Sequence, residues 1–297
     1  MRVAAVQYPM RGLKSFLEFQ RQLSYYAEAA ADYQCQFLLL PELLTLQLLS
    51  LELRGNDGQR LSKAHEVERL AQWTPDYQQL LVQLAQRFSL NIIGATHLSR
   101  GPDGITHNQG YIVSKTGEME TQCKIHPTPD EVSEWGVQGG DRLQVYRLED
   151  VTFGVLICYD VEFPELARHL VDQGAELLFV PFCTDDRRGY LRVRYCSQAR
   201  AVENHCYLAM AGAVGCLPDV YNMDMQYAQN LLITPSDVAF ARDGILAEGT
   251  LNQEEIVIGD FDIGALRHSR RHRREQSRRD RRLDLYEYVW KKKPEGG

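Results

Sequence analysis

The chain reads TFGVLICYDVEFPELARHLVDQGAELLFVP over residues 152–181, which is the pattern of a strand, a helix and a second strand. The apolar and β-branched run 152–157 stops at Cys158. Residues 163–172 have helical spacing with a proline in the first turn, where its missing N–H costs little. Residues 177–180 form a second apolar run, so the stretch predicts a βαβ unit with two parallel strands.

The first forty residues repeat this pattern. Residues 3–7 and 37–40 are short apolar runs, and residues 13–33 between them carry apolar side chains at helical spacing. The chain has no low-complexity stretch or linker before its arginine-rich end. We therefore expect one α/β domain built from two related βαβ halves.

Further elements are predicted between and after the two units. Residues 66–88 have amphipathic spacing that fits one helix or two, 90–96 and 110–113 fit strands, and 191–204 fits a helix. Residues 124–141 contain several proline and glycine turn points and little periodicity, so we expect mostly loop there.

The composition is that of an ordinary globular protein, with 297 residues of which 44% are hydrophobic and 25% charged. These proportions exclude disordered, collagen-like and mini-protein classes. The seven cysteines are dispersed and form no CxxC pair, which argues against a zinc site or a thioredoxin-like motif. No apolar run approaches ~18 residues and the N-terminus lacks a signal-peptide pattern, so we expect a cytoplasmic protein with reduced thiols and no membrane contact.

The charge is unevenly distributed along the chain. Residues 267–282 hold nine Arg and two acidic residues, a net of +7, and because the whole chain carries −7 the remainder carries −14. Arginine clusters of this density neutralise phosphates in nucleic-acid-binding proteins. The segment has no interleaved aromatic residue before Tyr286 and matches no nucleic-acid module, so we expect no nucleic-acid partner. The acidic body, in the same chain or across a dimer, is the expected partner instead.

Three reactive side chains stand at the ends of strand-like segments, where open α/β sheets place their active sites. Glu42 follows the run 37–40, Lys124 lies in TQCKIHP, and Cys158 ends the run 152–157. Together they supply a thiol nucleophile, a carboxylate base and an ammonium that can stabilise an oxyanion. A thiol near the start of a helix is also favoured as thiolate.

Each of these residues has a plainer interpretation when it is taken singly. A glutamate after a strand is commonly a cap or an ion-pair partner, and a lone lysine is commonly solvated. No histidine is paired with Cys158 in the sequence, so a papain-like arrangement has no positive support, although His126 lies close to Lys124.

The sequence resembles the carbon–nitrogen hydrolases of the nitrilase superfamily, over essentially the whole chain. The motifs occur in the family's order: AAVQ at 4–7, PEL around Glu42, CKIHP around Lys124, ICYDVEFPEL around Cys158, ARAVENHCYLAMAG at 199–212 and RRDRRLDLY at 278–286. The resemblance implies a four-layer α–β–β–α sandwich. It implies a hydrolase domain over 1–266, with 267–297 as an Arg-rich segment packed on that domain or across a subunit interface.

The family's catalytic roles map onto single positions of this chain. The resemblance implies Glu42 as the general base, Lys124 as the oxyanion-stabilising lysine and Cys158 as the nucleophile. Many members use a second glutamate after the lysine, and the TPxE pattern favours Glu131 over Glu134, which stays the alternative.

The residues around the nucleophile refine the expected reaction. Amidase-like branches resemble Cys-Tyr-Asp, as in Cys158-Tyr159-Asp160, whereas nitrilases proper resemble Cys-Trp-Glu. The backbone N–H of Tyr159 is expected to assist at the oxyanion, and Asp160 to orient its loop. Asp185 and Arg188 lie in a loop that borders the pocket in this fold, where they would either bind substrate or pair with neighbouring charges on the surface.

We therefore expect a cysteine-dependent hydrolase that cleaves a small linear amide to an acid and ammonia or an amine, through a thioester acyl-enzyme. An N-carbamoyl amidohydrolase and then a nitrilase are the alternative enzymes, and polyanion binding by the basic tail is the non-enzymatic alternative. The chemistry needs no metal or cofactor. The family usually forms dimers through helices beside the nucleophile, here 163–172 and 191–204, and the chain's subgroup resembles the hydrolase part of acetyltransferase-fused members.

Overall fold

The computed structural model describes residues 1–52, 63–101, 103–218, 220–272 and 276–291. The first half contains β1 (Arg2–Met10), α1 (Phe16–Asp32), β2 (Phe37–Leu40), the 3-10 helix η1 (Leu44–Leu48), α2 (Leu49–Glu52), α3 (Lys63–Phe88), β3 (Asn91–Arg100), β4 (Thr106–Val113), β5 (Met119–Cys123) and α4 (Pro129–Trp135). The second half contains β6 (Tyr146–Leu148), β7 (Val151–Val155), the 3-10 helix η2 (Cys158–Glu162), α5 (Pro164–Asp172), β8 (Leu177–Phe182), α6 (Arg187–Asn204), β9 (Tyr207–Gly215), β10 (Leu231–Ile233), β11 (Ile245–Glu248), β12 (Glu255–Asp260), α7 (Ile263–Arg271) and α8 (Gln276–Arg279). None of the helices in these described ranges is long and apolar enough to span a bilayer.

The strands form two sheets of the same design. Within the described residues, the first sheet has the order β12-β1-β2-β3-β4-β5 and the second has the order β11-β10-β9-β8-β7-β6. Strands β1, β2 and β3 are parallel in the first sheet, and β7, β8 and β9 are parallel in the second. The sheets join where residues 8–10 of β1 pair with residues 213–215 of β9. The two parallel cores confirm the two predicted βαβ units.

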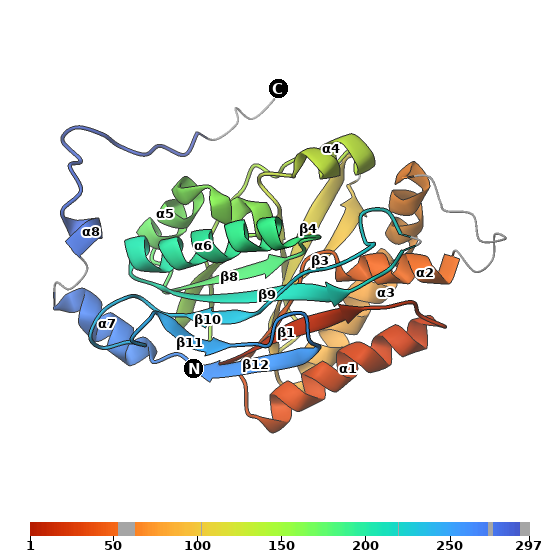
Figure 1. Cartoon of the computed structure of the whole chain (residues 1–297), viewed down its shortest axis with the longest axis horizontal. Helices are drawn as coiled ribbons and strands as arrows, with labels where there is room; N and C mark the ends of the chain where they lie inside the picture. The colour runs from red at the N-terminus through yellow and green to blue at the C-terminus, as the bar shows by residue number, and fades with distance from the viewer. Residues whose placement is uncertain (53–62, 102, 219, 273–275, 292–297) are drawn as a thin grey trace.

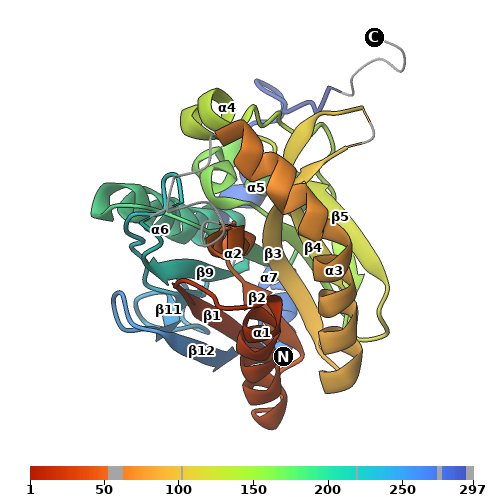
Figure 2. The same cartoon turned by 90° about the vertical axis from the view of Figure 1, so that its right-hand side faces the viewer.

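Helices cover the outer face of each sheet (Figures 1 and 2), with α1 and α3 on the first sheet and α5 and α6 on the second. Strand β1 shows how one strand serves two layers, because successive side chains point to opposite faces. Ala4 and Val6 pack with residues of α1 and α3, whereas Val3 and Ala5 pack with residues of the second sheet. The predicted four-layer α–β–β–α sandwich is therefore confirmed.

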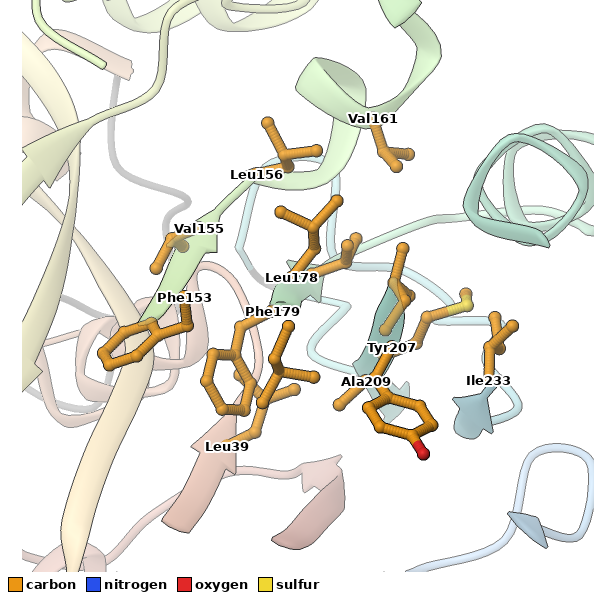
Figure 3. Packing of buried hydrophobic residues seen from close by; sticks show 14 of the residues in the cluster. Leu39, Phe153, Val155, Leu156, Val161, Leu178, Phe179, Tyr207, Ala209 and Ile233 are labelled. Carbon is orange, nitrogen blue, oxygen red and sulfur yellow. The ribbon is translucent and has the colours of Figure 1, made fainter. Parts of the chain in front are cut away.

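Aromatic side chains fill the space between the two sheets. The ring centroid of Phe37 on β2 lies 5.6 Å from that of Phe153 on β7 and 5.5 Å from that of Phe179 on β8. Figure 3 shows Phe153, Phe179 and Leu39 gathered in this layer. Full burial of each such side chain contributes about 1.5–3 kcal/mol. The layer holds β2 against β7 and β8, and β2 and β7 are the strands that lead to Glu42 and Cys158.

The arginine-rich segment contacts the acidic body through a few specific side chains. Arg267 on α7 donates to the Glu176 carboxylate at 2.6 Å, and Arg270 donates to two backbone carbonyls. Beyond α8, Arg281 donates to Asp172 at the end of α5, at 2.9 Å. These ion pairs are partly exposed to solvent, and such pairs contribute about 1 kcal/mol or less each to stability. They therefore orient the segment more than they stabilise it.

Candidate active site

The three strand-end residues converge on one site. Glu42 follows β2 after Pro41, Lys124 directly follows β5, and Cys158 follows β7 as the first residue of η2. Cys158 has a φ of +50°, a left-handed conformation that turns the chain sharply out of the strand. All three side chains are at most 5% exposed.

Lys124 lies between two buried carboxylates. Its Nζ donates to Glu42 Oε1 at 2.8 Å and to Glu131 Oε2 at 2.5 Å. Glu131 is 3% exposed, whereas Glu134 is partly exposed and accepts a hydrogen bond from Ser133. The structure therefore brings Glu131, and not Glu134, to Lys124.

Glu131 is held by the start of a short helix that the sequence pattern did not predict within 124–141. Thr128 caps α4, and its Oγ1 accepts from the backbone N–H of Glu131 at 3.2 Å. In return Glu131 Oε2 accepts from the backbone N–H of Thr128 at 2.7 Å. This reciprocal capping box fixes the Glu131 carboxylate so that it points at Lys124.

Asn108 is a site residue that sequence reasoning missed. It lies on β4, is fully buried, and its Nδ2 donates to Glu42 Oε1 at 2.8 Å and to Glu131 Oε1 at 2.7 Å. The strand was predicted to begin at residue 110, after Asn108, whereas β4 begins at Thr106 and includes it. An asparagine inside a buried strand was the available signal, because buried amides need partners.

The pKa values of the ionisable groups in this cluster shift in different directions. Burial raises the pKa of Glu42, and the attraction of Lys124 offsets this only in part. Burial also disfavours the Glu131 carboxylate, but Lys124 and hydrogen bonds outweigh it and lower the pKa of Glu131. Burial opposes the Lys124 ammonium, yet the two carboxylates raise its pKa well above the usual value. Glu131 is therefore held as carboxylate, and Glu42 is the carboxyl suited to exchange a proton.

Cys158 is held as a thiol rather than a thiolate. Burial and the Glu42 carboxylate raise the pKa of Cys158 well above its usual range, although Lys124 opposes this. We expected the start of a helix to stabilise the thiolate of Cys158. That effect is outweighed here, because η2 is a single short turn and the thiol is buried beside a carboxylate. The backbone N–H of Cys183 donates to Glu42 Oε2 at 3.0 Å, which keeps that carboxylate next to the thiol.

Asp160 ties the Lys124 segment to the Cys158 turn, as its expected orienting role requires. Its buried carboxylate accepts from the backbone N–H groups of Ile125 at 3.1 Å and His126 at 2.8 Å. The His126 ring also contacts Asp160 and stacks on Phe163, and His126 does not line the cavity beside Cys158.

A cavity of about 370 Å³ opens over the cluster, a volume suited to a small molecule. Its lining comprises Glu42, Leu43, Lys124, Thr128, Pro129, Asp130, Glu131, Trp135, Cys158, Tyr159, Glu162, Cys183, Thr184, Asp185, Gly189, Arg192, Val193, Asn222, Met223 and Gln226. In the described part of the chain, no group of three or more His, Cys, Asp and Glu side chains is placed to hold a metal ion.

Two of the three expected substrate-binding residues line the cavity, and the third does not. Tyr159 and Asp185 line the cavity, but Arg188 does not. The Arg188 side chain is 86% exposed and pairs with Asp186 at 2.9 Å, the surface alternative considered above. Arg192, one turn further along α6, lines the cavity in its place.

The site's geometry can be compared with known proteins. The carbon–nitrogen hydrolase family model matches residues 2–271. The chain belongs to the carbon–nitrogen hydrolase family. The predicted family is thereby confirmed. Amidases among the relatives of this chain support the predicted class of amidase-like hydrolase.

Relatives of this carbon–nitrogen hydrolase include curated proteins and solved structures. It is 44% identical to "Probable hydrolase YhcX" of Bacillus subtilis over 98% of the chain, and the match spans 56% of that longer protein. It is 30% identical to a deaminated glutathione amidase of Synechocystis over 64% of the chain and 71% of that protein. A solved carbon–nitrogen hydrolase from Helicobacter pylori G27 superposes with a TM-score of 0.79 at 19% identity, covering 96% of each chain.

Proposed function

We propose that the protein hydrolyses a small linear amide to its acid and ammonia through a thioester on Cys158. The observation that carries the proposal is the buried cluster of Glu42, Lys124 and Glu131 beside the Cys158 thiol at the floor of the cavity. The similarity to a deaminated glutathione amidase supports an amide as the substrate class.

The cluster supplies each proton that the reaction moves. Glu42 takes the thiol proton as Sγ attacks the amide carbon, and then gives it to the leaving nitrogen, so that ammonia departs and a thioester remains. Two of the three N–H bonds of Lys124 are directed at carboxylates, which leaves the third for the oxyanion, together with the backbone N–H of Tyr159. Glu42 then removes a proton from the water that attacks the thioester and passes it to the departing Cys158 sulfur, which releases the acid and restores the thiol.

A substrate panel tests the proposal. The purified protein is incubated with short aliphatic amides, amides that also carry a carboxylate, N-carbamoyl amines and the matching nitriles, and ammonia, carbon dioxide and acid are measured. We expect ammonia and acid in equal amounts from at least one amide, without carbon dioxide, and an acyl mass adduct on Cys158 after acid quench. Equimolar carbon dioxide, or turnover of nitriles but of no amide, would contradict it.

The two candidate glutamates provide a matched pair of variants. Glu131→Gln is expected to lower kcat by about 10²-fold, because Glu42 is then the one carboxylate paired with the Lys124 ammonium and becomes a weaker base for the Cys158 thiol. Glu134→Gln changes a partly exposed carboxylate away from Lys124 and is expected to stay within roughly twofold of wild type. Both rates are measured on the best amide of the panel, with thermal unfolding as the folding control. Equal losses in the two variants would remove Glu131 from the mechanism.

A further inference from the structure

Asn108 supplies the neutral donor that the charge arrangement of the site requires. Two carboxylates, Glu42 and Glu131, share one ammonium, that of Lys124, so the buried cluster has one negative charge in excess. A buried carboxylate without enough donors is costly, and hydrogen bonds to the charged form reduce that cost. Asn108 Nδ2 directs one N–H bond at each carboxylate, at 2.8 Å and 2.7 Å.

The orientation of this amide follows from its surroundings. Turning the amide over would place Oδ1 against two carboxylate oxygens, which repel it, so the NH₂ group faces them. Within the described residues Asn108 Oδ1 has no hydrogen-bond partner, so the oxygen contributes little to holding the side chain. The side chain of Asn108 therefore makes its hydrogen bonds to the two glutamates and none to the rest of the described residues.

The main chain of Asn108 is part of the same arrangement. Its carbonyl oxygen accepts from the backbone N–H of Lys124 at 2.9 Å, where β4 pairs with the end of β5. One residue therefore contacts the backbone of Lys124 and the side chains of both Glu42 and Glu131.

We propose that Asn108 is a positioning residue that clamps Glu42 and Glu131 with the two N–H bonds of one amide, and so keeps Glu42 ionised as the proton acceptor for Cys158. The inference rests on the proposed function for its catalytic meaning. Glu42 is faced by Lys124 after β5, by Glu131 on α4, by the Cys158 thiol after β7, and by the thiol and backbone N–H of Cys183 after β8. Asn108 also contacts Glu42, and unlike these neighbours its side chain is an amide that does not titrate. Its two N–H donors are therefore present at every pH.

The test uses the reactivity of the Cys158 thiol, which is measurable without a substrate. Iodoacetamide alkylates the sulfur with loss of iodide, and the thiol proton passes to Glu42, so the acid limb of the alkylation rate reports the protonation of Glu42. Asn108→Leu removes both donors at similar volume, and Asn108→Ser keeps one donor in a smaller side chain. The acid limb is the part of the pH profile in which the alkylation rate falls as the pH is lowered. We expect it to shift to higher pH by about one pH unit or more in Asn108→Leu and by less in Asn108→Ser.

Asn91 provides the matched control. It is also a buried asparagine, on β3, and its Nδ2 donates to Gln36 O at 3.0 Å and Glu149 Oε1 at 3.1 Å, away from the cavity. Asn91→Leu is expected to lower the melting temperature without moving the acid limb. If both folded Asn108 variants kept the wild-type acid limb, or moved it no more than Asn91→Leu does, the inference would be wrong.

The amide panel separates this failure from a failure of the proposed function. If wild type turns over an amide, the kcat/KM of Asn108→Leu is expected to show the same upward shift of its acid limb. If wild type turns over no amide, the proposed function fails, while the alkylation profile still decides whether Asn108 controls the protonation of Glu42.

Discussion

Replacing Cys158 with alanine is expected to lower the amide hydrolysis rate by at least about 10⁴-fold, to the level that binding and the oxyanion donors alone can support. The loss follows from the proposed chemistry, because Glu42 would have no thiol to deprotonate and no thioester could form. The thiol is 5% exposed at a strand end, so its removal leaves a cavity of one sulfur atom. The fold is expected to survive with a lower melting temperature.

The control for this variant is another buried cysteine. Cys35→Ala removes a thiol that is 6% exposed and packs with α1 and the outer face of the first sheet, far in the fold from the Cys158 turn. It is expected to keep wild-type turnover while it lowers the melting temperature to a similar extent. Turnover of amides by Cys158→Ala at the wild-type rate, with circular dichroism unchanged, would exclude the cysteine mechanism.

The strand-end residues were predictable because the signals for them are local. A fully apolar run that stops at Pro41 or at Cys158 marks a buried strand and its end, and parallel strands bring their carboxyl ends to one edge. The sequence therefore predicted Glu42, Lys124 and Cys158 as a set, and the structure places all three around one cavity.

The residues that were missed depend on packing between elements. Asn108 lies at the site because β4 extends further than its apolar pattern, and the residue is fully buried against Glu42 and Glu131. Arg188 was expected in a loop, but α6 begins at Arg187, and helical spacing then puts Gly189, Arg192 and Val193 on the face toward the cavity. The start of a helix is hard to locate from sequence, and an error of a few residues changes which arginine faces the cavity.

Replacing Lys124 with methionine is expected to remove activity and to destabilise the fold in a pH-dependent way. Methionine fills much of the same volume without charge, and Glu42 and Glu131 are then buried without a cation. Breaking a buried ion pair by removing one partner costs about 3–5 kcal/mol, so unfolding by urea at pH 7 should show a loss of that order. Amide turnover is expected to fall by about 10³-fold or more, because the oxyanion loses its ammonium.

The pH dependence distinguishes this cause from a loss of packing. In wild type the pKa of Glu131 is lowered, so its stabilising contribution is present at neutral pH and is lost as the pH falls through that lowered value. In Lys124→Met only neutral hydrogen-bond donors oppose burial, so the pKa of each carboxyl is expected to lie above its unfolded value of about 4.3. The variant then keeps its stability below that pH and loses it as the pH rises, so the gap to wild type should be small near pH 4–5 and wide at pH 7.

The exposed pair of Lys115 and Glu149 provides the control for charge removal alone. Lys115 Nζ lies 2.6 Å from Glu149 Oε1, but its side chain is 48% exposed, so Lys115→Met is expected to cost about 1 kcal/mol or less at any pH. A destabilisation of Lys124→Met that is the same at pH 5 and pH 7 would mean that lost packing explains it. A gap that widens with pH, together with a flat response in Lys115→Met, would show that one ammonium keeps two buried carboxylates ionised at the site of the proposed reaction.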